Sequence, residues 1–72
     1  PDIFPNPTTG PVLLKGDFAG RMVRVTDLAG REVLAKNMDE SSVIDLSEQP
    51  NGVYLIEIQT DREKVVKRIL KN

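Results

Sequence analysis

The side chains of this chain that could do chemistry are carboxylates and cations, because the sequence contains neither histidine nor cysteine. Nucleophilic catalysis of the Ser-His-Asp or Cys-His kind is therefore impossible, and no disulfide or thiolate metal site can form. Asp39, Glu40 and Asp45 are the candidates for a catalytic carboxylate pair. We interpret Asp39 and Glu40 as solvated loop charges and Asp45 as part of an exposed strand face. The sequence therefore predicts no catalytic residues, no cofactor and no enzyme activity.

Oxygen ligands for Ca²⁺ are present on Asp17, Asp27 and Asp45, but these residues lie in separate predicted turns and lack the spacing of an EF-hand. Gly16 and Gly20 do not form a phosphate-binding loop, because no Gly-Lys-Ser/Thr ending and no helix follow them. The sequence therefore predicts no metal site and no small-molecule substrate.

The cations gather at the end of the chain. Residues 1–61 carry five Lys or Arg against ten Asp or Glu, whereas residues 62–72 carry five against one. This basic end could touch nucleic acid or anionic lipid, but it lacks the interleaved aromatic residues on which bases stack, and the net charge is −1. We predict no nucleic-acid binding. A solvated strand face that discourages edge-to-edge pairing explains the cations, but not their segregation at the end.

The elements that must position these charges are short strands, which glycine and proline separate at short intervals. A chain of 72 residues allows one domain with a small core, and no apolar run approaches the roughly 20 residues that span a bilayer. Val23 and Val25 alternate with polar neighbours, which is the period of a strand with one buried face. The predicted strands are 12–15, 21–27, 31–36, 43–46, 53–60 and 63–70, with a seventh at an edge if Ile3 and Phe4 pair. Residues 37–42 and 47–52 are predicted loops, and residues 21–36 a hairpin.

The closing segment, residues 63–70, fits two structures. Its apolar residues also lie on one helical face, at positions i, i+1, i+4 and i+5. The adjacent Val65 and Val66 favour a strand, because β-branched side chains are stiff at χ1, and the short turn before them favours a hairpin. We therefore predict an all-β fold, an Ig-like antiparallel β-sandwich of six or seven short strands, smaller than the usual Ig domain of about 100 residues.

Three motifs follow one another along the chain. They are Pro5-Asn6-Pro7-Thr8-Thr9-Gly10, then Val25-Thr26-Asp27-Leu28-Ala29-Gly30-Arg31, then Asp45-Leu46-Ser47 through Pro50-Asn51-Gly52-Val53-Tyr54. The basic segment 64–72 closes the chain. This ordered set resembles the type A C-terminal sorting domain of the type IX secretion system (Por secretion system) of Bacteroidota-type bacteria, over nearly the whole chain.

The resemblance implies that residues 1–72 are a single C-terminal sorting domain of a longer secreted protein, with the cargo upstream. The cargo would wait in the periplasm until the type IX translocon recognises this domain and passes the cargo across the outer membrane. A cell-surface sortase-like peptidase would then remove the domain and leave the cargo attached to the cell surface or secreted.

The resemblance also assigns roles to residues. Scaffold roles, in turns and as an aromatic anchor, are expected for Pro5, Asn6, Pro7, Gly10, Asp27, Gly30, Gly52 and Tyr54. Translocon recognition is expected of the final segment, through Lys64, Val65, Lys67, Arg68, Ile69 and Lys71. Among these, Lys67 is the foremost candidate.

Two other functions stay open on the sequence alone. An ancillary Ig-like binding module of an extracellular enzyme would bind carbohydrate or protein, and carbohydrate modules stack sugar rings on exposed aromatic side chains. The chain has only Phe4, Phe18 and Tyr54 for this purpose, and we expect Tyr54 to be buried. A structural spacer is the third hypothesis, and it predicts that the domain lies inside its parent chain.

Overall fold

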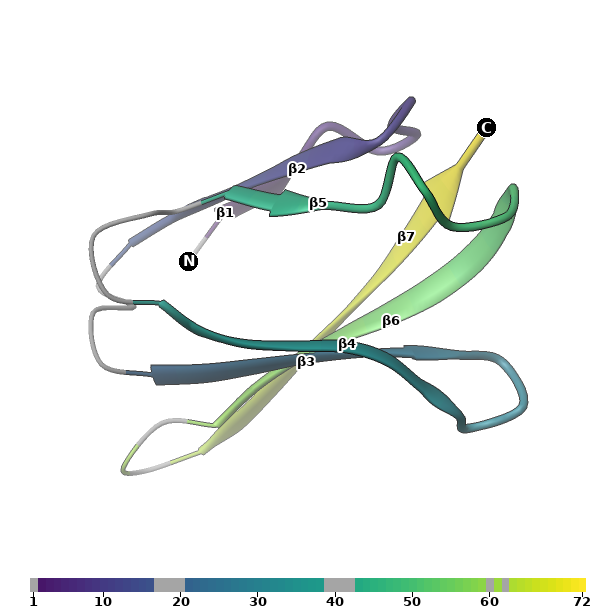
Figure 1. The fold of residues 1–72 in the computed structure, drawn as a ribbon. Helices are drawn as coiled ribbons and strands as arrows, with labels where there is room; N and C mark the ends of the chain where they lie inside the picture. Colours follow the sequence, from purple (N-terminus) through teal and green to yellow (C-terminus); the bar gives the residue numbers. More distant parts are fainter. Residues whose placement is uncertain (1, 17–20, 39–42, 60, 62) are drawn as a thin grey trace.

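Two antiparallel sheets pack face to face in the computed structural model, which describes residues 2–16, 21–38, 43–59, 61 and 63–72 (Figure 1). The strands are β1 Asp2–Phe4, β2 Pro11–Lys15, β3 Arg21–Asp27, β4 Glu32–Met38, β5 Val43–Asp45, β6 Gly52–Gln59 and β7 Lys64–Lys71. The smaller sheet has the order β1-β2-β5 and the larger β4-β3-β6-β7. The predicted all-β sandwich is confirmed, including its seventh strand at an edge.

The core consists of alternate strand residues that point between the two sheets. The buried hydrophobic side chains are Ile3, Val12, Leu14, Val23, Val25, Met38, Ile44, Leu46, Tyr54, Ile56, Ile58 and Ile69. The alternation of Val23 and Val25 in β3 is as the sequence predicts, and Tyr54, Ile56 and Ile58 are buried at alternate positions of β6. Each fully buried aliphatic side chain contributes roughly 1.5–3 kcal/mol, so this small set is what holds the two sheets together.

The hairpin partner β4 is longer than predicted. Residues 37–42 are predicted to form a loop, but β4 continues through Asn37 to Met38, and Met38 lies opposite Arg21 in the register. Asn37 is exposed on the strand while the Met38 side chain is only 1% exposed. The polar residue misled the prediction, because a solvent-facing strand position tolerates it.

The closing segment is a strand, and the helical alternative is wrong. β7 pairs with β6 without a register shift, from Gly52 opposite Lys71 to Gln59 opposite Lys64.

No helix long and apolar enough to span a membrane occurs in the part of the chain that the structure describes. Several candidate residues of the sequence lie outside the described residues, namely Asp17, Phe18, Gly20, Asp39 and Glu40.

Candidate recognition surface

The first motif of the chain is hydrogen-bonded to the last strand. The Asn6 side chain donates from Nδ2 to the Arg68 carbonyl at 3.0 Å and accepts at Oδ1 from the Leu70 N–H at 3.0 Å. The Thr8 N–H donates to the Leu70 carbonyl at 2.8 Å, and the Asn72 N–H donates to the Thr8 carbonyl at 2.9 Å. We call residues 6–8 the clasp. It covers the outer edge of β7 from the Arg68 carbonyl to the end of the strand and also bonds Asn72, the residue after it.

The clasp is itself held by the turn that follows it. Thr8 is buried, and its Oγ1 donates to the Pro11 carbonyl at 2.6 Å and accepts from the Gly10 N–H at 3.0 Å. A Cβ on Gly10 would lie 3.1 Å from the Ser47 Cα, so Ser47 would have to shift to make room for a side chain there. Pro5 and Pro7 flank Asn6, and both follow cis peptide bonds.

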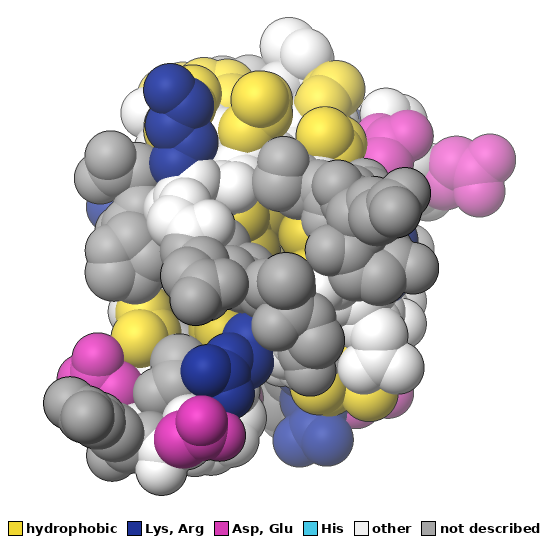
Figure 2. Space-filling view, turned by 90° about the vertical axis from the view of Figure 1, so that its left-hand side faces the viewer, with side chains coloured by type: hydrophobic (Ala, Val, Ile, Leu, Met, Phe, Trp, Pro, Cys, Tyr) yellow, Lys and Arg dark blue, Asp and Glu magenta, His cyan; other side chains and the backbone are white. Residues whose placement is uncertain are grey.

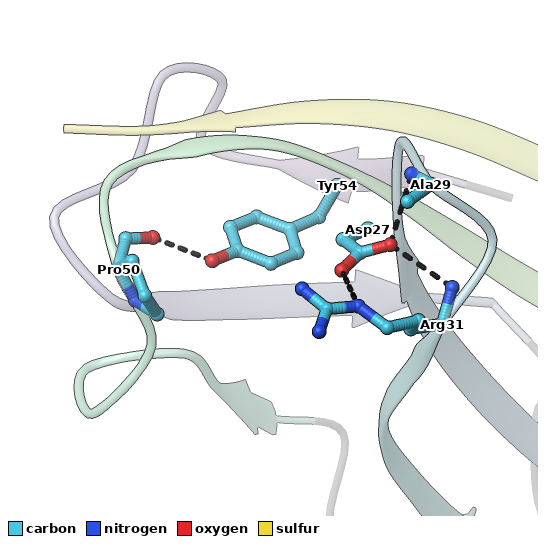
Figure 3. Close-up of polar contacts among 5 residues, drawn as sticks. All are labelled: Asp27, Ala29, Arg31, Pro50 and Tyr54. Atoms are coloured by element: carbon cyan, nitrogen blue, oxygen red, sulfur yellow. Dashed lines mark hydrogen bonds and ion pairs between the residues drawn. The ribbon is translucent and has the colours of Figure 1, made fainter.

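The second motif forms the β3–β4 turn around one carboxylate (Figure 3). Asp27 Oδ1 accepts from the Ala29 and Arg31 N–H groups, both at 2.9 Å, and Oδ2 accepts from Arg31 Nε at 3.0 Å. Gly30 has φ +87°, a left-handed conformation that favours glycine. The Arg31 backbone N–H is the main reason that the pKa of Asp27 lies below its ordinary value, and the Arg31 side chain adds to it.

The third motif surrounds Tyr54, which lies directly opposite Asp27 in the β3–β6 register. The ring is buried, and the hydroxyl donates to the Pro50 carbonyl four residues upstream (Figure 3). This arrangement matches the tyrosine corner of Ig-type sandwiches. Gly52, at φ +153°, begins the strand.

Strand β7 presents its cations in two environments. Lys64, Lys67 and Arg68 are exposed, and Lys64 forms an ion pair with Glu57 at 2.8 Å. Lys71 is instead buried, and its Nζ donates to the Gln49 carbonyl and to Asn51 Oδ1. Three of the four cations on β7 are therefore exposed, and the fourth, Lys71, holds the loop before β6.

The two apolar residues predicted for recognition lie toward the core. Ile69 is fully buried and Val65 is half-buried against the core cluster. Both come from the odd-numbered positions of β7, whose side chains face the smaller sheet. Neither presents a contact surface comparable to that of Val66, which is 52% exposed on the outer face.

The rest of the described surface carries mixed charges and a shallow depression. On the end of the molecule in Figure 2, cations and carboxylates are interspersed, and hydrophobic side chains gather over the smaller sheet. A shallow depression of about 260 Å³ lies on the larger sheet and is lined by Met22, Arg24, Glu57 and Gln59. Arg24 is paired with Glu32 at 2.7 Å and Glu57 with Lys64. Among the described residues, no three His, Cys, Asp or Glu side chains gather to hold a metal ion.

The family model of secretion system C-terminal sorting domains matches residues 2–72. The chain belongs to this family. It is therefore a sorting signal of the type IX secretion system, and the family resemblance inferred from the three motifs is confirmed. No curated protein matches the chain.

The match gives the sorting domain its general context. Such a domain works with the type IX secretion machinery on behalf of a cargo domain upstream, and it directs export across the outer membrane toward the cell surface or the medium. The family is a sorting signal and not a catalytic one.

Sequence reasoning missed two residues of this surface. Thr8 belongs to the first motif but has no predicted role, although it is buried and bonded to β7. Lys71 was grouped with the exposed cations, although it is buried. The sequence offers no signal for either, because both depend on which distant segments meet. Lysine has a long apolar stem that can be buried while the ammonium group finds oxygen partners.

Proposed function

We propose that this sorting domain carries its export address on the exposed part of β7, where the type IX translocon contacts Lys64, Lys67 and Arg68. The observation that supports this best is the exposure of these cations together on an edge strand. Neither Lys67 nor Arg68 has an ion-pair partner among the described residues, so their charges are available to a partner.

The remaining motif residues hold this strand in place. In this proposal Val65, Ile69 and Lys71 support the surface from the core side, and the scaffold residues of the three motifs fix the turns. Pro5, Asn6, Pro7 and Gly10 belong to the clasp and its turn. Asp27, Gly30, Gly52 and Tyr54 fix the two turns beside β3 and β6.

We further propose the order of events for the whole protein. The domain is the last one of a longer secreted chain, and it passes through the periplasm before the translocon engages it. A cell-surface sortase-like peptidase then removes the domain, and the cargo stays attached to the surface or is released. A cleavage product lacking residues 1–72 on intact cells would support this order, and uncleaved surface cargo would contradict it.

The export role is tested with a reporter that carries a periplasm-directing signal and ends in residues 1–72, in a host with this secretion system. The reporter should reach the medium or the cell surface. Neutralising the three exposed cations, by Lys64→Gln, Lys67→Gln and Arg68→Gln together, should leave it in the periplasm. The control is Lys15→Gln on β2, which removes an exposed cation elsewhere. Periplasmic retention of the unmodified fusion, beside a sorting domain that works, would defeat the proposal.

A carbohydrate-binding role receives less support. Tyr54 is buried, and Phe4 is 38% exposed. Phe4 lies in a row with Leu13 and Val43, which are its successive cross-strand neighbours on the smaller sheet. This row offers one partly exposed aromatic ring between aliphatic neighbours, which is a poor platform for stacking sugar rings.

A further inference from the structure

The clasp leaves part of an edge strand uncovered. β7 has β6 on one side only, and the clasp bonds begin at the Arg68 carbonyl and continue toward the C-terminus. In an antiparallel ladder, successive residues turn their backbone groups alternately toward and away from the partner strand. The Arg68 carbonyl and the Leu70 N–H and carbonyl bond to the clasp. The backbone N–H and C=O groups of the even-numbered residues of β7 therefore point away from β6.

The uncovered stretch comprises Lys64, Val66 and the N–H of Arg68. No hydrogen-bond partner for their outward groups occurs within the described residues. Such a row of unpaired donors and acceptors is a template on which another extended chain can add as a strand. The β6–β7 register is regular, so no bulge interrupts this template.

The other edge strand of the same sheet, β4, contains a β-bulge. In β4, Val33 is an extra residue, because the register passes from Leu34 opposite Val25 to Glu32 opposite Thr26. A bulge of this kind bends an edge and discourages strand addition. Of the two edges of the larger sheet, the upstream half of β7 is therefore the one suited to pairing.

The charges decide which strand can pair there. Lys64, Val66 and Arg68 share the outer face of the sheet, and Lys67 is exposed on the other face. A second copy of this chain, paired antiparallel about Val66, would place Lys64 opposite Arg68, and like charges directly opposite destabilise a sheet. A strand with acidic residues beside these two cations, and an apolar residue beside Val66, would complement them.

We infer that residues 64–68 of β7 bind an extended acidic segment of a type IX translocon component by strand addition, with an acidic–apolar–acidic alternation facing Lys64, Val66 and Arg68. This inference rests on the proposed function and names the chemistry of the partner. The clasp sets the limit of the docking edge, because it already occupies the outer backbone groups from the Arg68 carbonyl onward.

A proline variant tests the backbone pairing. Val66→Pro removes an N–H that faces solvent and leaves the β6–β7 ladder intact, which is the edge position where proline is tolerated in a sheet. The matched control is Ala35→Pro. Ala35 is exposed on β4, and the ladder alternation through β6 and β3 turns its N–H outward on the opposite edge.

Each variant is placed in the reporter fusion described above, and folding is checked by protease resistance of the fusion. Ala35→Pro should be exported at the wild-type level, and Val66→Pro should be exported at least tenfold less while resisting protease equally. Export of folded Val66→Pro at the wild-type level would overturn strand addition while leaving the sorting function standing. Failure of the unmodified fusion to be exported would instead defeat the proposed function.

Photo-crosslinking from two positions provides a second test, which does not depend on the folding of Val66→Pro. A photoreactive amino acid replaces Val66 or Ala35 in the fusion, which is irradiated in cells. We expect covalent capture of a translocon component from position 66 and not from position 35, with acidic residues flanking the crosslinked site. Capture from position 35 alone, or from neither position, would overturn the inference.

Discussion

Thr8 and Lys71 form a parallel bridge, although they belong to opposite ends of the chain. The bonds on either side of this bridge join Thr8 to Leu70 and to Asn72. Asn6 extends the contact by two further bonds to β7. The first motif of the sorting domain is therefore part of the same structural unit as the strand that we propose as the export address.

The first prediction concerns the clasp. Asn6→Asp keeps the size of the side chain but removes the donor to the Arg68 carbonyl, so the free energy of unfolding should fall by about 1 kcal/mol. The measurement is the free energy of unfolding from urea denaturation at neutral pH, for the isolated domain or for the reporter fusion. Asn37→Asp is the control, since Asn37 is an exposed residue of β4. Equal stability of the two variants would contradict the assigned role of Asn6.

The parts of the fold that the sequence predicts are those with local causes. The alternation around Val23 and Val25 indicates a strand with one buried face, and the Asp27–Gly30 turn is built from bonds within five residues. Such features depend only on neighbouring side chains. Apart from the end of β4, which continues through Asn37 and Met38, the predicted strands and the hairpin are therefore confirmed.

The parts that could not be predicted depend on contacts across the chain. Nothing near Asn6 indicates that its amide meets β7, and nothing near Lys71 indicates that its ammonium group meets Gln49 and Asn51. A basic residue at a chain end reads as solvated, because lysine is mostly exposed in proteins. The charge split and the family resemblance predict a candidate surface on this strand, but its division into exposed and buried cations could be seen only in the structure.

The second prediction concerns the tyrosine corner. Tyr54→Phe keeps the buried ring but removes the hydroxyl that donates to the Pro50 carbonyl. We expect a loss of about 1 kcal/mol in the free energy of unfolding, with an unchanged circular dichroism spectrum. Chemical denaturation of the two proteins side by side provides the comparison. A midpoint identical to that of the wild type would show that this bond contributes nothing measurable.

The third prediction concerns acid. Hydrogen bonds from Arg31 and Ala29 lower the pKa of Asp27, and hydrogen bonds from the Ser47 hydroxyl and N–H lower the pKa of Asp45. A carboxyl group with a lowered folded-state pKa contributes stability above its unfolded pKa of about 3.9, and this stability is lost as the pH falls through the folded pKa.

Thermal unfolding should therefore be measured from pH 7 to pH 2. The contribution of these two carboxylates to the stability should be constant above about pH 5 and decline at lower pH. In the double variant Asp27→Asn and Asp45→Asn, stability at pH 7 should be lower and the decline below pH 5 shallower. A double variant with the same acid profile as the wild type would rule out these carboxylates as its source.

The fourth prediction concerns Lys67, the foremost candidate for translocon contact. Lys67→Glu reverses a charge that is exposed and has no ion-pair partner among the described residues. The change should cost little stability, because no ion pair of the described residues involves Lys67. Export of the reporter fusion should nevertheless fall several-fold, since a translocon surface complementary to cations would now meet a carboxylate.

The matched control for this prediction is Lys15→Glu, which makes the same charge change at an exposed position of β2 in the smaller sheet. Net charge then changes equally in both variants, so a difference in export reports position and not overall charge. Reduced export for both variants would point to net charge as the cause. Wild-type export of Lys67→Glu would remove Lys67 from the address and leave Lys64 and Arg68 to be tested in the same way.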